Sequence, residues 1–324
     1  MLVDLPPELR GALESQLRGI PEAALSRATQ DLSRRYRREN PADSQVELSA
    51  EDVEAYAAYR LPATYAATVA VLTALREQKI DWYPRSLLDL GAGLGSGLWA
   101  ASVVWPSIEQ MVAVDSQPSM IAIGRNLSRA ASRLALRTAR WVQSDLRGES
   151  LDAHREIVLL AYVLSEIEPT ELTAIVDRAW DATTEALVVI EPGTPAGYER
   201  VRLIRDHLAT RGGYSLAPCP HDPPCTVPTD DWCHFSVRVP RSRMHRVAKD
   251  ASLSYEDEKF SYVVMSRSPV RQSYSRILRH PQIRKGHIYL QLCTSEGVKT
   301  VVVPKSDRER FNRARKASWG DIFE

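Results

Sequence analysis

Short apolar segments alternate with longer amphipathic ones between residues 85 and 210, and no other feature constrains the fold as strongly. The expected strands lie at 86–90, 110–114, 139–143, 156–162 and 186–190. The expected helices lie between and after them, at 96–105, 117–137, 169–182 and 195–210. Alternation of this kind favours parallel strands joined by right-handed crossovers. The sequence therefore predicts an α/β fold with a doubly wound sheet.

The segments on either side of this core have other patterns. Residues 1–80 show helical periodicity, and we expect Pro62 to break or kink the helix that contains it. Residues 212–234 interrupt the alternation with Gly, Pro and Cys, and two strand-like runs after them should complete the sheet, at 235–239 and 260–265. We predict three parts: an N-terminal helical region (1–80), an α/β domain with a Cys-rich insertion (81–268), and a small basic β module with a C-terminal tail (269–324).

Composition restricts the setting in which the chain works. Apolar residues make up 44% of its 324 residues, enough for a packed core. No apolar run approaches the ~20 residues of a membrane helix, and the N-terminus lacks the basic and apolar segments of a secretory leader. We expect a protein of a reducing cytoplasm that contacts no membrane and whose cysteines stay reduced or bind metal.

The formal net charge of +1 conceals an asymmetry along the chain. From Arg267 onward there are 13 Lys and Arg against 5 Asp and Glu, a charge of +8, whereas the preceding residues hold 29 and 36, a charge of −7. Clustered Lys and Arg side chains bind phosphates. The basic end therefore indicates contact with nucleic acid, with an ordinary solvated face as the alternative.

A glycine-rich turn follows the first expected strand, in Leu87-Leu-Asp-Leu-Gly91-Ala-Gly93-Leu-Gly95-Ser-Gly97. Glycine allows tight turns and leaves no Cβ between backbone and ligand, and a turn of this kind at the carboxyl end of a strand is typical of nucleotide sites. Asp115, twenty residues past Gly95, ends the second expected strand, where a carboxylate can accept two hydrogen bonds from a ribose. The alternatives are a NAD site and an incidental glycine turn.

This pair of motifs resembles the S-adenosylmethionine site of class I methyltransferases over residues 85–266. Gly91, Gly93 and Asp115 match the first two motifs of that superfamily. Asp145 lies where the superfamily contacts adenine, and Tyr162 follows the fourth strand beside the methyl-donor pocket. The resemblance implies the class I methyltransferase fold and S-adenosylmethionine as cofactor, bound by Asp89, Gly91, Ala92, Gly93, Gly95, Asp115, Ser116, Asp145, Leu146 and Tyr162.

No motif identifies the methyl acceptor. The Asn/Asp-Pro-Pro-Tyr/Phe tetrapeptide of base N-methylating enzymes is replaced by Ala161-Tyr-Val-Leu-Ser-Glu166, and no cysteine nucleophile for C5-cytosine chemistry lies near the fourth or fifth strand. Tyr162 and Glu191 are the candidates for catalysis, with Glu191 as a general base. A carboxylate that caps a turn at the strand end is an equally good interpretation of Glu191.

The cysteines form a separate signal. Cys219, Cys225 and Cys233 fall within fifteen residues, and Cys293 lies in the basic module. No Cys-x2-Cys pair is present, so common zinc ribbons fit poorly. Four thiolates suit Zn²⁺ or an iron–sulfur cluster, His221 and His234 are spare ligands for a three-cysteine zinc site, and plain buried thiols are the remaining interpretation.

A longer series of segments resembles the methyltransferase-like protein family of the mitochondrial ribosomal small subunit, in its bacterial branch. The segments are Arg60-Leu-Pro-Ala-Thr-Tyr65, the glycine turn, the Cys-rich block that ends in Trp232-Cys-His-Phe-Ser-Val-Arg-Val-Pro-Arg241, and Tyr255-Glu-Asp-Glu-Lys-Phe-Ser-Tyr262. The resemblance implies a bacterial cytoplasm, binding to small-subunit rRNA, and a [4Fe–4S] cluster. Its ligands would be Cys219, Cys225, Cys233 and Cys293, joining the basic module to the α/β domain.

Two sets of basic residues are expected to contact RNA phosphates. The first follows the third cysteine and consists of Arg238, Arg241 and Arg243, and the second lies in the basic module and consists of Arg279, Arg284 and Lys285. Tyr274 and Tyr289 offer faces for base stacking, although ordinary strand packing is the favoured interpretation of Tyr289. A small β module with such a surface suits single-stranded or looped RNA.

The preferred interpretation is a monomeric, iron–sulfur-containing rRNA methyltransferase that binds S-adenosylmethionine and acts on the small ribosomal subunit during assembly or translation. The first alternative is a non-catalytic assembly factor that keeps the methyltransferase fold as an RNA-binding scaffold. The second is a small-molecule methyltransferase whose basic residues are only a solvated face.

Overall fold

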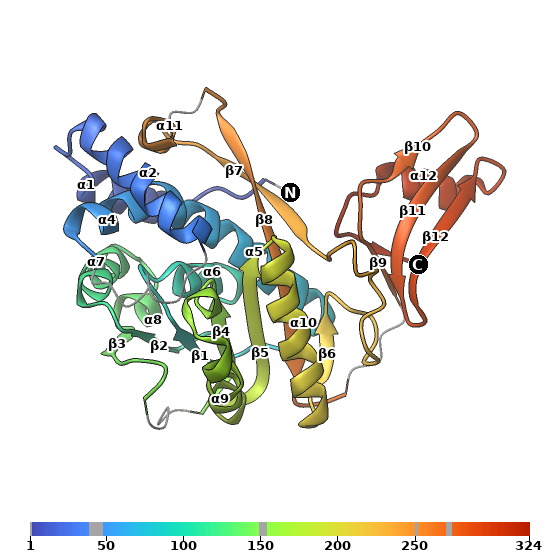
Figure 1. Ribbon diagram of the computed structural model, residues 1–324, viewed down its shortest axis with the longest axis horizontal. Coiled ribbons are helices and arrows are strands. Elements are labelled where there is room, and N and C mark those ends of the chain that lie inside the picture. Colours follow the sequence, from blue (N-terminus) through green and yellow to red (C-terminus); the bar gives the residue numbers. More distant parts are fainter. Residues whose placement is uncertain (1, 39–47, 149–153, 250–251, 270–273) are drawn as a thin grey trace.

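The computed structural model describes residues 2–38, 48–148, 154–249, 252–269 and 274–324 (Figure 1). A large mixed sheet forms the body, and a small antiparallel sheet at the C-terminal end projects to one side of it. The predicted fold class is confirmed, since the chain is mixed α/β with helices before the large sheet and a small β unit after it. The three domain boundaries stay a prediction.

Among the described residues, eight strands form the large sheet, in the order β3-β2-β1-β4-β5-β8-β6, with β7 paired to β8. The first five strands in this order are parallel, whereas β8 runs antiparallel to β5, β6 and β7. The bounds are β1 (Ser86–Leu90), β2 (Gln110–Asp115), β3 (Arg140–Gln143), β4 (Arg155–Ala161), β5 (Thr183–Pro192), β6 (Tyr214–Ala217), β7 (Phe235–Pro240) and β8 (Tyr255–Ser266).

The predicted strands and their crossover helices are present, and they bury both faces of the sheet. Alternate strand residues enter opposite cores: Leu87 and Leu159 pack with the helices on one side, and Leu88 and Leu160 pack with α9 and α10 on the other. Proline at the start of α7, α9 and α10 suits the first helical turn, where no N–H is needed. The helices are α6 (Ser96–Val104), α7 (Pro118–Arg129), α8 (Leu134–Arg137), α9 (Pro169–Asp181) and α10 (Pro195–Thr210).

Two elements differ from the sequence prediction. The single helix expected at 117–137 is divided into α7 and α8, and between them the Ser132 N–H donates to the Glu8 carboxylate of α1 (3.1 Å). The Ser132 N–H thus binds a side chain of a distant element, whereas in a continuous helix it would donate to a carbonyl of the same helix. Residues 212–234 do not merely interrupt the sheet, because the four residues of β6 form its edge beside β8.

The N-terminal helices pack in the same core as the sheet and are not a separate layer. The chain passes from α4 through a π-helical turn, η1, into α5, and Pro62 lies in the first turn of α5. The expected break at Pro62 is therefore a change in hydrogen-bond register, which removes the need for the N–H that proline lacks. The elements are α1 (Pro7–Gln16), α2 (Glu22–Arg38), α4 (Ala50–Ala55), η1 (Tyr56–Arg60) and α5 (Leu61–Gln78).

The C-terminal β unit has its own small core. Ile288, Leu290 and Leu292 of β11 pack with Ala314 of α12. Within the described residues its sheet has the order β10-β11-β9-β13, with β12 paired to β11. The elements are β9 (Ser275–Ile277), β10 (Gln282–Ile283), β11 (His287–Thr294), β12 (Gly297–Pro304), α12 (Arg308–Lys316) and β13 (Ile322–Phe323), and α11 (Arg243–Lys249) lies between β7 and β8.

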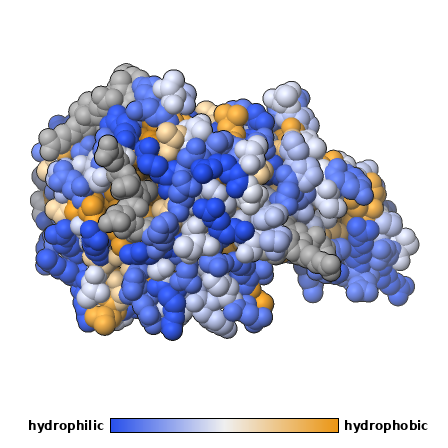
Figure 2. Space-filling model, turned by 90° about the horizontal axis from the view of Figure 1, so that it is seen from below, coloured by the Kyte–Doolittle hydropathy of each residue, from blue (hydrophilic) through white to orange (hydrophobic). Residues whose placement is uncertain are grey.

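Hydrophilic residues dominate the face shown in Figure 2, where hydrophobic residues lie in small separate groups. None of the helices in the described part of the chain has the length and apolar character needed to cross a membrane.

Gly97, in the first turn of α6, tests the packing of that helix on β1. A Cβ there would overlap the Asp89 carboxylate and lie 2.5 Å from Cδ2 of Leu159. We expect Gly97→Ala to lower the free energy of unfolding by about 1–3 kcal/mol in urea denaturation. Gly11 of α1 is the control, since a Cβ there meets nothing within 4 Å and Gly11→Ala should stabilise the helix by up to about 1 kcal/mol. Equal effects of the two changes would contradict this packing.

Candidate functional sites

A cleft opens at the carboxyl ends of β1, β2 and β4, between the glycine turn, the loop after β3, the loop after β4 and η1. Parallel α/β sheets place their ligand sites at this edge. Seven of the ten predicted cofactor residues line the cleft: Gly91, Gly93, Asp115, Ser116, Asp145, Leu146 and Tyr162. The other three, Asp89, Ala92 and Gly95, do not line it, so the structure brings together most of the predicted site.

The glycine turn exposes its backbone to the cleft. Gly91, Gly93 and Gly95 have φ values of 75°, 53° and 83°, a region that favours glycine. A Cβ on Gly93 would meet only the Tyr56 hydroxyl, at 3.8 Å, whereas a Cβ on Gly91 would overlap the Val163 side chain. Gly91 is thus required by packing, and Gly93 leaves space for a ligand.

Asp115 is held in position by backbone groups on both sides of the cleft. The Gly93 N–H donates to Oδ2 (2.7 Å) and the Gln117 N–H to Oδ1 (2.9 Å). Burial raises the pKa of the Asp115 carboxyl, and these backbone hydrogen bonds act in the opposite direction. The carboxylate therefore has a defined orientation at the end of β2. Asp145, by contrast, forms an ion pair with Arg147 (2.6 Å) that lowers the pKa of its carboxyl.

Asp89 lies on β1 behind the glycine turn. It is 2% exposed, and Oδ2 has no hydrogen-bond partner among the described residues. Burial, with a smaller contribution from the charge of Asp115, raises the pKa of Asp89 to about 8. Glu166, which does line the cleft, has its pKa raised to about 8 for the same reasons. In and behind the cleft, burial thus disfavours the ionised form of these carboxyl groups.

Tyr162 closes one end of the cleft in a strained conformation, with a φ of 59°. Its hydroxyl donates to Glu258 Oε1 of β8 (3.1 Å), and Arg60 Nη1 of η1 lies 3.2 Å from the same oxygen. The Arg60 guanidinium also lies 4.9 Å from the centre of the Tyr162 ring. Chemistry did not single out Arg60 or Glu258 in the sequence, and the only signal was their presence in the segments that carry the family resemblance.

Glu191, the candidate general base, is fully buried and does not line the cleft. Its Oε1 accepts the Leu164 N–H (3.2 Å) and its Oε2 the Arg200 Nε–H (2.8 Å). This geometry corresponds to the turn-capping interpretation. Within the described residues, the carboxyl groups that line the cleft are those of Asp115, Asp145 and Glu166.

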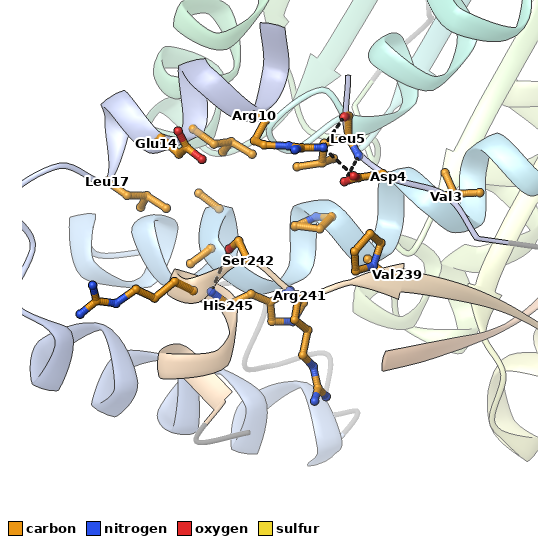
Figure 3. Close-up of a pocket in the computed structure, with 16 residues that line it drawn as sticks. Val3, Asp4, Leu5, Arg10, Glu14, Leu17, Val239, Arg241, Ser242 and His245 are labelled. Carbon is orange, nitrogen blue, oxygen red and sulfur yellow. Dashed lines mark hydrogen bonds and ion pairs between the residues drawn. The ribbon is translucent and has the colours of Figure 1, made fainter. Parts of the chain in front are cut away.

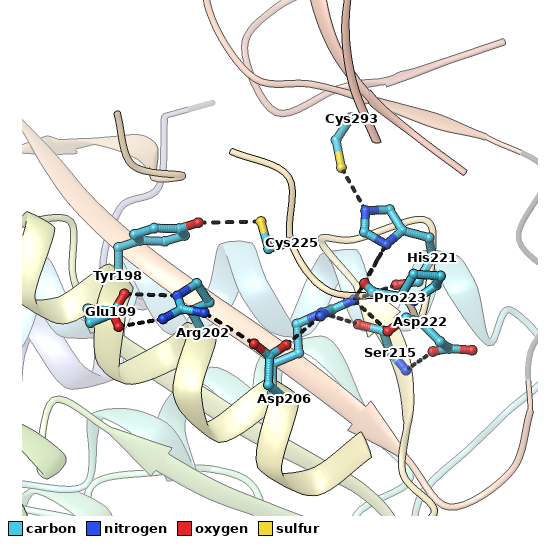
Figure 4. Close-up of polar contacts among 11 residues, drawn as sticks. Tyr198, Glu199, Arg202, Asp206, Ser215, His221, Asp222, Pro223, Cys225 and Cys293 are labelled. Atoms are coloured by element: carbon cyan, nitrogen blue, oxygen red, sulfur yellow. Dashed lines mark hydrogen bonds and ion pairs between the residues drawn. The ribbon is translucent and has the colours of Figure 1, made fainter. Parts of the chain in front are cut away.

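The four cysteines line a second cavity, between α10, the Cys-rich segment and the C-terminal sheet. Figure 4 shows Cys293 pointing from the C-terminal sheet toward His221, and Cys225 facing Tyr198 of α10. The Cys293 Sγ–His221 Nε2 distance is 3.5 Å, and the Tyr198 hydroxyl lies 3.3 Å from Cys225 Sγ. In the described part of the chain, no group of three or more His, Cys, Asp or Glu side chains is placed to hold a metal ion.

Arg205 of α10 organises the Cys-rich segment. It is 3% exposed, and its Nη2 donates to the carbonyls of His221 (2.8 Å), Asp222 (3.0 Å) and Pro223 (2.7 Å). Burial raises the pKa of the Cys219 thiol, and the Arg205 charge opposes this effect. A buried cation thus lies beside the thiol cavity.

Contacts between polypeptide segments also join the C-terminal sheet to the Cys-rich segment. Arg276 Nε lies 3.4 Å from the Pro218 carbonyl, and the Val298 N–H donates to Thr226 Oγ1 (2.9 Å). The rings of His234 and Trp319 meet edge to face, 4.8 Å apart. Direct contacts between polypeptide segments thus contribute to the packing of the two parts.

The basic residues predicted to bind RNA occupy different environments. Arg238 pairs with Asp257 (2.7 Å) and Arg243 with Glu22 (3.0 Å). Arg279 forms an ion pair with Asp231 and donates to the Trp232 carbonyl (3.1 Å). Arg241 pairs with Glu256 (3.0 Å). Arg284 and Lys285 are exposed, and neither forms an ion pair with a described residue.

Arg241 and Arg243 line another cavity, of about 480 Å³, between the N-terminal segment and β7–α11. Figure 3 shows Arg10 and Glu14 of α1 on one side and Ser242 and His245 on the other. The cavity lies apart from the cleft and the thiol cavity, since it shares no lining residue with either.

The strand order and the glycine turn at the end of β1 define a class I methyltransferase fold. The family model of the mitochondrial small ribosomal subunit protein Rsm22 matches residues 50–324, and the chain belongs to this family. The match includes the four cysteines, the C-terminal sheet and every residue that lines the cleft except Leu48.

Curated relatives include the human mitochondrial ribosome assembly protein METTL17, 28% identical over 296 residues, with coverage of 83% of this chain and 61% of that protein. The mitochondrial Rsm22-cox11 tandem protein 2 of Schizosaccharomyces pombe is 25% identical over 325 residues, with coverage of 84% and 43%. The chain thus spans about three fifths of one relative and less than half of the other. Both are mitochondrial proteins, so the bacterial branch and the bacterial cytoplasm stay predictions.

Solved structures with similarity in fold include magnesium protoporphyrin IX methyltransferase from Synechocystis with bound SAH. It is 13% identical with a TM-score of 0.42, and the match covers 63% of this chain and 84% of that one. The N-methyltransferase NodS from Bradyrhizobium japonicum, in complex with S-adenosyl-l-homocysteine, is 13% identical with a TM-score of 0.39, and the match covers 60% and 84%.

Asp89 makes stability depend on pH in a defined direction. Its pKa of about 8 in the folded protein exceeds the value of about 4 in an unfolded chain, so between these values the folded state keeps a proton that the unfolded state loses. Stability contributed by this proton falls as pH rises through the window. We expect Asp89→Asn to gain stability relative to the unsubstituted protein between pH 5 and pH 8.5, measured by urea denaturation.

Asp145→Asn is the control for Asp89→Asn. The ion pair with Arg147 lowers the pKa of Asp145, so its carboxyl is ionised in both states throughout this window, and its effect on stability should not change with pH. A difference for Asp89→Asn that is constant or shrinks as pH rises would contradict the buried, protonated carboxyl.

Proposed function

We propose that this chain binds S-adenosylmethionine and transfers its methyl group to rRNA of the small ribosomal subunit during assembly or translation. The observation that carries the proposal is the orientation of Asp115, whose carboxylate is fixed by the Gly93 and Gln117 N–H groups at the edge of an open cleft. Family membership supports the ribosomal part, because the human relative is a ribosome assembly protein. We expect the protein to act as a monomer.

The residues of the cleft suit this cofactor. Asp115 would accept hydrogen bonds from the ribose, Asp145 and Leu146 would contact the adenine, and the bare backbone at Gly93 would allow close approach. Asp89, Ala92 and Gly95 would support the turn from behind. The bound cofactor would supply an electrophilic methyl group, and Tyr162, held by Glu258, would close the methyl-donor end.

The second candidate is a non-catalytic assembly factor that uses the same fold as a scaffold. The contacts of the two residues proposed for catalysis favour this candidate. The Tyr162 hydroxyl is hydrogen-bonded to Glu258, and the Glu191 carboxylate is hydrogen-bonded to Arg200. Neither group is free to accept a proton from a substrate. Glu166, a half-buried carboxyl that lines the cleft, is a further candidate for that role.

Labelled S-adenosylmethionine and small ribosomal subunits that lack the modification distinguish the two candidates. We expect the protein to transfer label to the RNA. Asp115→Ala should bind the cofactor about 10- to 100-fold more weakly in calorimetry, because two hydrogen bonds to a charged group are lost. Asp181→Ala, a change at an exposed carboxylate on α9, is the control. Cofactor and subunit binding without label in the RNA would favour the scaffold, and unchanged affinity of Asp115→Ala would contradict the proposed site.

We also propose a [4Fe–4S] cluster held by Cys219, Cys225, Cys233 and Cys293, with zinc as the alternative. The proposal is supported by the four thiols around one cavity and by the buried cation Arg205 beside them. No group of three or more His, Cys, Asp or Glu side chains in the described part of the chain is placed to hold a metal ion, so this geometry favours neither zinc nor the cluster. A cluster spreads its thiolates over several irons and would reinforce the junction between the C-terminal sheet and the Cys-rich segment.

Metal analysis of protein purified without oxygen tests the cluster. We expect iron and acid-labile sulfide in equal amounts. Cys293→Ser should lose the iron and make the C-terminal sheet more sensitive to proteolysis, because metal binding contributes to folding. His221→Asn separates the alternatives, since it should keep the metal of a four-cysteine cluster and lose that of a three-cysteine zinc site with histidine. Zinc in place of iron, or no metal, would contradict the cluster.

The six residues predicted to bind RNA differ in their ion pairs and exposure, and these differences support some of them more than others. Arg238, Arg241 and Arg279 are engaged by Asp257, Glu256 and Asp231. Arg243 pairs with Glu22 but is 80% exposed, and Arg284 and Lys285 are exposed in the hairpin between β10 and β11. We propose that RNA phosphates bind chiefly at Arg284 and Lys285.

A further inference from the structure

The C-terminal sheet has one covered and one open face. Ile288, Leu290 and Leu292 of β11 are buried against the α12 side, together with Val303 of β12. The residues that alternate with them on β11, His287, Tyr289 and Gln291, belong to the opposite face. No described element packs over the outer part of that face, since Tyr289 is 36% and Val302 50% exposed.

The cross-strand register defines the composition of this open face. Tyr289 is opposite Gln282 of β10 and Val302 of β12, and Gln291 is opposite Thr300. Residues opposite each other on antiparallel strands point to the same side. The His287 ring packs edge to face on Tyr289, with ring centres 4.7 Å apart, and orients it. The face therefore has an oriented aromatic ring surrounded by amide and hydroxyl groups.

Positive charge borders the open face. Arg284 and Lys285 lie in the hairpin that connects β10 to β11, and Lys305 follows β12, and all three are exposed. The Lys305 N–H donates to the Gly286 carbonyl (2.9 Å), which brings the end of β12 next to that hairpin. The cations thus gather at the outer end of the sheet, beside His287 and Tyr289.

We propose that this open face binds single-stranded RNA, with a base stacked on Tyr289, base edges bonded to Gln282, Gln291 and Thr300, and phosphates at Arg284 and Lys285. The inference rests on the proposed RNA-binding function and names the surface that performs it. An exposed ring on a sheet stacks only on an unpaired base, because bases in a duplex stack on one another. Charge complementarity selects a polyanion, and the small apolar area around Val302 would contribute little to docking of a protein.

The same face leads to the thiol cavity. Cys293 follows Tyr289 by four residues on the same side of β11, about 13 Å along the strand, where it is opposite Val298 and Arg276. RNA on the open face would therefore lie directly next to the junction between the two parts of the molecule. At this position, the packing between the C-terminal sheet and the Cys-rich segment would determine the orientation of the open face relative to the ribosome.

From the sequence, Tyr274 and Tyr289 both offer faces for base stacking, and ordinary strand packing is the favoured interpretation of Tyr289. In the structure the roles differ. Tyr274 is half-buried, with its hydroxyl bonded to the Leu216 carbonyl (3.2 Å) and its ring 5.1 Å from the Arg276 guanidinium. Tyr289 is the exposed ring, because β11 has a covering helix on one side only.

The test measures binding of a fluorescent single-stranded RNA, and of a duplex of the same length, to the full chain. We expect Tyr289→Ala to weaken single-strand binding about tenfold or more and Tyr289→Phe to retain it, since the ring provides the stacking energy. Tyr83→Ala, a change at a tyrosine that is 68% exposed outside the C-terminal sheet, should have no effect. Replacing Arg284 and Lys285 together by Gln should reduce the salt dependence of binding.

The outcomes separate this surface from the wider proposal. If the unsubstituted protein binds RNA and Tyr289→Ala binds equally well, the open face is not the site, while RNA binding itself stands. Equal affinity for the duplex would overturn stacking on an unpaired base. Normal RNA binding by Tyr289→Ala with lost binding to small subunits would assign the face to a ribosomal protein. No RNA binding by the unsubstituted protein would remove the RNA part of the proposed function as well.

Discussion

The pairing of β8 with three other strands holds together the functional parts of this molecule. One half of β8 pairs with β5 and β6 and the other with β7. Glu258 on β8 bonds Tyr162 at the closed end of the cleft, and the Ser261 hydroxyl donates to the Cys233 carbonyl beside the thiol cavity (2.8 Å). A shift of one residue in this strand would exchange its two faces and break both contacts, so the register of β8 couples the cleft to the cavity.

Acidic and basic side chains are concentrated in different parts of the molecule. Asp115 and Glu166 line the cleft and Asp89 lies behind the glycine turn, and burial is the main cause of the raised pKa of all three carboxyl groups, whereas exposed cations border the C-terminal sheet. Burial and the negative charge of neighbouring carboxyl groups disfavour the ionised forms of Asp89 and Glu166. Under the proposed function the cationic sulfonium of S-adenosylmethionine would bind near these carboxyl groups, and the polyanionic RNA would bind at the other end. Each end thus attracts a ligand of the opposite charge.

Much of the sheet could be predicted because its strands are encoded locally. The strands at 86–90 and 110–115 are short buried runs, and the glycine turn between β1 and α6 needs residues that tolerate positive φ. Other features depend on distant partners. The break between α7 and α8 accompanies a hydrogen bond from Ser132 to Glu8, and the role of Arg279 follows from Asp231, 48 positions away. No local pattern contains such information.

The amino-acid sequence by itself determined the α/β class, the position of the cleft at the ends of β1 and β2, and the presence of an unusual set of four cysteines. These properties follow from local periodicity and from residues whose chemistry is specific. Only the tertiary structure decided that the cysteines face one cavity, that Glu191 lies beneath the cleft in an ion pair with Arg200, and that Tyr289 is exposed while Tyr274 is packed. The reason is that burial and pairing depend on which surfaces meet, and contacts between segments far apart in the chain establish that.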